Sequence, residues 1–110
     1  MKIIYNSIVP FKGFIAMNLF SVLFVRNEYK GKLSDKTINH EKIHTEQQKE
    51  LLFVFFYILY LIEWFIKLFL PGNAYRNISF EQEAYDYEND MNYLKTRKRY
   101  TWIKYIFKKA

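Results

Sequence analysis

The sequence predicts an α+β fold in which an N-terminal β-hairpin precedes a predominantly helical part. Residues 2–8 and 14–26 are rich in β-branched and aromatic side chains, which is typical of two strands. Residues 51–62 are all apolar or aromatic, which indicates an apolar helix in the second half of the chain. We therefore expect a hairpin followed by four helices: a motif-bearing helix, the apolar helix, an acidic helix and a basic C-terminal helix.

Each boundary between these elements has a local signal. Residues 10–13 contain a proline and a glycine, and they supply the turn of the expected hairpin. Residues 27–32 are mostly polar and predict a loop. Ser34 or Asp35 can cap the helix that follows this loop. The Pro-Gly pair at residues 71–72 ends the apolar helix.

Length and composition limit what the chain can contain. Its 110 residues predict one small domain spanning residues 1–110, with no separate substrate-binding domain. There is no cysteine, so disulfides cannot stabilise the fold. Aromatic residues make up 21% of the chain, more than an ordinary core of this size requires. We expect part of this aromatic surface to contact a membrane, a partner chain or an apolar substrate.

The motif His40-Glu41-Lys42-Ile43-His44 points most directly to chemistry. It contains both histidines of the chain, and it matches the zinc-hydrolase pattern H-E-x-x-H. Residues i and i+4 lie on one face of a helix, so the two imidazoles can share one ion. Glu41 then flanks the open coordination position, where it can act as a general base. The motif therefore predicts a Zn²⁺ cofactor with His40 and His44 as ligands and Glu41 as the catalytic residue.

A zinc site of this kind needs a third protein ligand. Because the chain has no cysteine and no other histidine, the third ligand must be a carboxylate. The acidic segment 80–86, which reads as a helix, offers Glu81, Glu83 and Asp86. Its acidic residues could instead form a solvated helix face.

The motif and the acidic segment together resemble the gluzincin group of metallopeptidases, in its membrane-type and minimal members. This resemblance covers roughly residues 39–90 and implies a minimal zincin core, with Glu81 as the third ligand and Glu83 as the alternative. Ala84 also matches that group's pattern. Tyr85 stands where the group commonly has an acidic or amide residue that supports a ligand histidine, and Asp86 is the expected substitute.

The apolar segment 51–70 is long enough to cross a bilayer, although Glu63 and Lys67 interrupt it. A straight helix from the motif to Leu70 would carry the chain about 40 Å away. The eleven residues from Leu70 to Glu81 reach only about 36 to 40 Å when fully extended. If Glu81 is a ligand, the helix must therefore reverse, and residues 53–57 are the expected place.

Two alternatives to this reversal stay open. A second copy of the chain could supply the ligand, which would make the protein a homo-oligomer. Otherwise the apolar segment spans a membrane and no complete site forms.

The formal net charge is +6, and cations crowd residues 95–109, interleaved with aromatic side chains. This pattern fits a helix that binds anionic lipid, or one that packs its aromatic side on the core. Nucleic acid is disfavoured as a partner because no recognised nucleic-acid module accompanies the basic residues.

The expected function is zinc-dependent hydrolysis of a peptide or protein substrate, with Tyr75, Arg76 or Tyr85 as donor to the oxyanion. A strand edge beside the site could hold the extended substrate. The alternative is a non-catalytic membrane-associated protein with a structural or vestigial metal site. Localisation is expected to be membrane-associated or cytoplasmic, because polar residues interrupt the N-terminal apolar region and make it a poor signal peptide.

Overall fold

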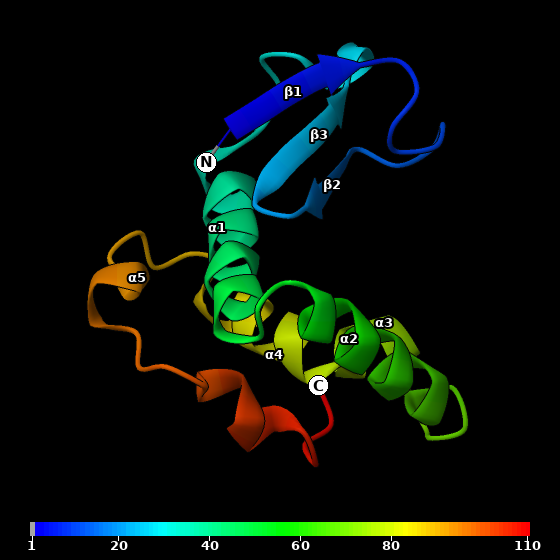
Figure 1. The fold of residues 1–110 in the computed structure, drawn as a ribbon, viewed down its shortest axis with the longest axis vertical. Coiled ribbons are helices and arrows are strands. Elements are labelled where there is room, and N and C mark those ends of the chain that lie inside the picture. Colours follow the sequence, from blue (N-terminus) through cyan, green and yellow to red (C-terminus); the bar gives the residue numbers. More distant parts are fainter. Residues whose placement is uncertain (1) are drawn as a thin grey trace.

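The computed structural model describes residues 2–110 and has an α+β fold, as the sequence predicts (Figure 1). A three-stranded sheet forms the N-terminal part, and the helices follow it. In chain order the elements are β1 (Lys2–Asn6), β2 (Ala16–Leu19), β3 (Val22–Arg26), the 3-10 helix η1 (Asn27–Tyr29), α1 (Asp35–Glu50), α2 (Val54–Lys67), α3 (Ala74–Asn77), α4 (Ser79–Tyr87), α5 (Tyr93–Thr96) and the 3-10 helix η2 (Thr101–Tyr105).

The strands pair differently from the expected hairpin. The sheet order is β1-β3-β2, with β2 antiparallel to β3 and β1 parallel to β3. The hairpin therefore lies within residues 16–26, and residues 2–6 add a parallel strand on the far side of β3. Phe20 and Ser21 form the hairpin loop with φ of 50° and 68°, a conformation that suits the twist of an antiparallel pair.

Helix α1 begins at the expected cap, where the Ser34 side chain accepts a hydrogen bond from the Thr37 amide. Its buried face carries mostly polar side chains, including His40, His44 and Gln47. Ile43 is the apolar exception, and it packs with Ala84 of α4. A helix that buries polar groups must pair them inside the protein, and α4 and the β2–β3 hairpin supply many of the partners.

The chain reverses between α1 and α2 at residues 51–53, which overlap the expected segment 53–57 at Phe53. Leu52 and Phe53 have φ of 52° and 62°, and the Phe53 amide donates to the Gln48 carbonyl. The apolar segment therefore folds back as a 14-residue helix rather than continuing α1. Within residues 2–110, no helix combines the length and the apolarity that crossing a membrane requires.

The inner face of α2 packs on the second half of the chain. Phe56 lies in a buried cluster with Ile78, Phe80 and Trp102. The Phe80 and Trp102 ring centroids are 4.7 Å apart. The prediction of a single basic helix at the C-terminus is wrong. This region instead forms the short helices α5 and η2, with an extended connection between them (Figure 1).

Candidate metal centre

Three buried side chains from two helices converge on one point. His40 and His44 come from α1, and Glu81 comes from the first turn of α4. Oε1 of Glu81 lies 3.2 Å from Nε2 of His40 and 3.0 Å from Nε2 of His44, and the two Nε2 atoms are 3.2 Å apart. This group could hold a metal ion. The reversal after α1 makes the arrangement feasible within one chain, because α4 returns alongside α1.

The second nitrogen of each histidine ring has its own acceptor. Nδ1 of His40 lies 2.8 Å from Oε2 of Glu88, and Nδ1 of His44 lies 2.7 Å from Oε1 of Gln47. An Nδ1–H that donates to such an acceptor leaves the Nε2 lone pair free for a metal. Both imidazoles are thus oriented with Nε2 toward Glu81.

Gln47 is held in turn by Glu83. Its Nε2 donates to Oε1 of Glu83 and to the Phe80 carbonyl, both at 3.0 Å, so its Oε1 faces His44. Glu83 also accepts from the Tyr93 hydroxyl and from Arg97. The structure therefore places Glu83, the alternative ligand expected from the sequence, outside the group of three, and Glu83 supports His44 through Gln47.

Asp86 also lies outside the group, where it accepts a hydrogen bond from the Tyr105 hydroxyl. The role expected for Asp86, acceptor to a ligand histidine, falls to Glu88. The Tyr85 and His40 rings pack edge to face, with their centroids 4.6 Å apart. The Arg76 guanidinium lies 3.7 Å above the Tyr85 ring.

Sequence reasoning did not single out Glu88, and it noted Gln47 only as one of a glutamine pair after the motif, without a role at the site. Glu88 stands seven residues after Glu81, two helical turns along the same face, and Gln47 stands three residues after His44. That spacing was the available signal for both. A polar residue at such a position also occurs by chance on solvated faces, so the spacing alone does not select them.

The Glu81 carboxylate and the His44 imidazole shift each other's pKa. Burial opposes ionisation of Glu81, but the His44 charge and hydrogen bonds from both histidines hold its pKa well below its usual range. The Tyr60 hydroxyl also donates to Glu81 at 2.6 Å. Burial alone would lower the pKa of His44, yet the charge and hydrogen bond of Glu81 outweigh it and raise the pKa to about 9. The group thus keeps an ionised carboxylate inside the protein.

A cleft of about 580 Å³ opens beside these residues. His44, Glu81 and Glu41 line it, and all four residues of β2 border it. Burial raises the pKa of Glu41, and the charges of His44 and His40 offset this only in part. Tyr75 also lines the cleft. A carboxyl group with a raised pKa therefore lies within the same cleft as the candidate ligands.

Comparison of this chain with protein-family models, with curated proteins and with solved structures finds no match.

Proposed function

We propose that this protein is a zinc-dependent peptidase of the gluzincin type. The observation that carries the proposal is the convergence of His40, His44 and Glu81 beside a cleft that His44, Glu81 and Glu41 line. Two imidazole nitrogens and one carboxylate are the ligand set of known catalytic zinc sites, which keep a fourth position open.

The spacings between the three candidate ligand atoms fit zinc. Ligand atoms at about 2.0–2.1 Å from a tetrahedral zinc ion lie about 3.3 Å from one another. The three spacings here are 3.0, 3.2 and 3.2 Å. The acceptors behind both histidines favour the tautomer that binds through Nε2. The residues therefore suit zinc without further rearrangement of α1 and α4.

When bound, zinc supplies a Lewis acid that polarises the scissile carbonyl and acidifies water. Glu41 accepts the proton of the attacking water and later donates it to the leaving amine, and its raised pKa suits both transfers. Of the three donors expected from the sequence, Tyr75 borders the cleft, whereas Arg76 is stacked on Tyr85. Tyr75 is thus the proposed donor to the oxyanion.

The substrate peptide is proposed to bind along β2. This strand pairs with β3 on one side only within residues 2–110, and it borders the cleft along its whole length. An edge strand can hold an extended peptide by main-chain hydrogen bonds, which would align the scissile bond with Glu41.

Metal analysis and hydrolysis assays test the proposal. We expect about one zinc per chain, lost in His40→Ala/His44→Ala. Glu41→Gln should keep zinc and abolish cleavage of a fluorescein-labelled denatured casein and of a mixed peptide library. Glu46→Gln on the same helix, whose carboxylate pairs with Lys49 away from the centre, is the matched control and should retain activity.

Two results would contradict the proposal. If the double alanine variant bound as much zinc as wild type, His40 and His44 would not be zinc ligands. Stoichiometric zinc with no hydrolysis that depends on Glu41 would instead support the structural metal site of the non-catalytic alternative.

A further inference from the structure

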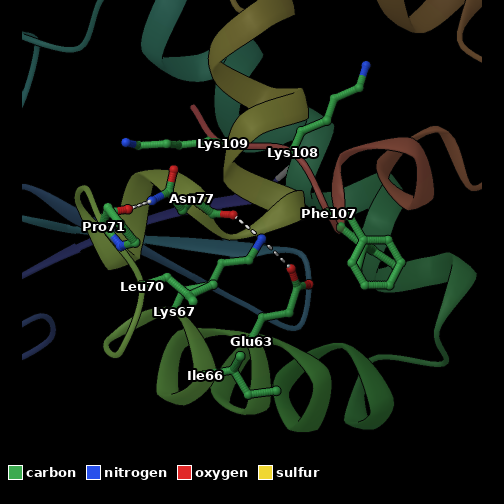
Figure 2. Close-up of a pocket in the computed structure, with 10 residues that line it drawn as sticks. Glu63, Ile66, Lys67, Leu70, Pro71, Asn77, Phe107, Lys108 and Lys109 are labelled. Carbon is green, nitrogen blue, oxygen red and sulfur yellow. Dashed lines mark hydrogen bonds and ion pairs between the residues drawn. The ribbon is translucent and has the colours of Figure 1, made fainter.

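Helix α2 buries its charged side chains and exposes its apolar ones, the reverse of an ordinary surface helix. Its two charged residues, Glu63 and Lys67, point inward, as Figure 2 shows. Glu63 accepts from the amide and hydroxyl of Ser79, and Lys67 donates to the Asn77 carbonyl and pairs with Glu63. Every exposed residue of α2 is apolar: Val54, Phe55, Ile58, Leu61, Ile62, Trp64, Phe65 and Ile66.

This apolar surface extends beyond the helix. Leu68, Phe69 and Leu70 continue it at the C-terminal end of α2. A loop before β2 also exposes large apolar side chains: Ile8, Phe11, Phe14 and Ile15. Phe14 and the α2 residues Tyr57 and Tyr60 line the same cleft, so the loop and the helix border one opening.

We call the exposed side chains of residues 54–70 together with those of the loop 8–15 the apolar face. Soluble monomers rarely expose large contiguous apolar surfaces, and residues 54–70 alone expose eleven large apolar side chains.

We propose that the apolar face binds the surface of an anionic lipid bilayer. Protein–protein interfaces carry about one hydrogen bond per 100–200 Å², but the exposed face of α2 has no charged side chain and only the indole N–H of Trp64 as a polar group. Such a surface matches hydrocarbon better than it matches another protein. Because the opposite face of α2 is packed on Ile78 and Phe80, the helix would lie along the membrane.

Lysines near the apolar face favour a bilayer that contains anionic lipids. A hollow of about 350 Å³ at the end of α2 is lined by Ile66 and Leu70 and also by Lys108 and Lys109 of the C-terminal region, all labelled in Figure 2. Lys12 is exposed within the apolar loop. Lysines beside an inserted apolar surface reach anionic headgroups, and each strengthens binding by about fivefold.

Vesicle flotation of the full chain tests this surface. We expect wild type to float with vesicles of phosphatidylcholine and phosphatidylglycerol. Leu61→Glu/Phe65→Glu should bind more than about tenfold more weakly, because burial of one such side chain alone has an effect of this size. Leu61 and Phe65 are 63% and 59% exposed, so the folded state should tolerate the change.

The matched control is Met91→Glu/Ile103→Glu, which adds the same charge at side chains that are 52% and 50% exposed outside the apolar face. It should bind as wild type does. Lys108→Ala/Lys109→Ala should weaken binding to anionic vesicles and leave binding to pure phosphatidylcholine vesicles nearly unchanged. Circular dichroism and zinc content show that each variant is folded, and neither readout requires catalytic activity.

Equal vesicle binding by the Leu61→Glu/Phe65→Glu variant and wild type would overturn the proposal. The proposal would also be overturned if the wild-type protein bound neither kind of vesicle. If that protein sedimented as a dimer and the Leu61→Glu/Phe65→Glu variant as a monomer, a second copy of the chain would be the partner that covers the apolar face.

Discussion

At the scale of single residues, the two histidines of the motif differ in the group that accepts a hydrogen bond from their Nδ1 atom. His40 relies on the carboxylate of Glu88, which also pairs with Lys36 at 3.4 Å. His44 relies on the neutral amide of Gln47, which Glu83 holds in place. Because Gln47 donates through Nε2 and accepts through Oε1, its orientation, and with it the tautomer of His44, is fixed by the charge of Glu83.

This chain of contacts gives a prediction for Gln47→Leu. The substitution removes the acceptor of His44 Nδ1, so we expect zinc affinity to fall about 10- to 100-fold. Competition with a zinc-binding dye measures the effect. Gln48→Leu is the matched control, because Gln48 is also buried and hydrogen-bonded, to Ser21 and Asn18, but touches neither histidine. Equal zinc affinities in the two variants would show that the Gln47 contact does not support the metal site.

The motif predicted which side chains converge, because helical spacing alone places His40 and His44 on one face. The absence of other histidines and of cysteine pointed to a carboxylate, and Glu81 lies beside both rings. The supporting residues could not be predicted in the same way. Which acidic residue of segment 80–88 meets which ring depends on the rotation of α4 about its axis, and packing of Ile78, Phe80 and Ala84 sets that rotation.

At the scale of elements, the reversal between α1 and α2 was predicted by chain length rather than by local sequence. The residues from Leu70 to Glu81 are too few to return from the end of a straight helix. No glycine or proline marks the turn. Leu52 and Phe53 instead adopt left-handed φ values, which cost of order 1 kcal/mol each in a residue with a Cβ. The strand pairing had no comparable constraint, because a short strand can join either edge of a two-stranded sheet.

Strain at the reversal predicts an unusual response to glycine. In Leu52→Gly, relief of the left-handed strain should offset the greater entropy of the unfolded chain, so we expect the free energy of unfolding to stay the same or rise by up to about 1 kcal/mol. Leu61→Gly, at a similarly exposed position inside α2, should lower it by about 1 kcal/mol. Urea denaturation compares the two variants. Equal destabilisation by both would contradict strain at Leu52.

At the scale of the whole molecule, several charged groups are buried while many large apolar side chains are exposed. Arg97, in the connection between α5 and η2, donates to Glu83 of α4 and to Glu50 at the end of α1. The side chains of Arg97, Glu83 and Glu50 are 5%, 0% and 7% exposed. One cation thus joins the C-terminal region to the two helices that carry the candidate metal centre, while the apolar surface of α2 faces outward.

Loss of Arg97 should therefore destabilise the molecule far more than loss of an exposed cation. Arg97→Met leaves Glu83 and Glu50 buried without their cation, and we expect the free energy of unfolding to fall by about 3–5 kcal/mol. Arg99→Met, at an exposed position two residues on, should change it by less than about 0.5 kcal/mol. Adding Glu83→Gln to Arg97→Met should recover part of the loss, since it removes one of the two uncompensated charges. Urea denaturation of the four proteins, wild type included, measures these differences.

Equal effects of the two arginine substitutions would mean that the C-terminal region is held by its aromatic contacts, those of Trp102 above all, and not by this buried ion cluster.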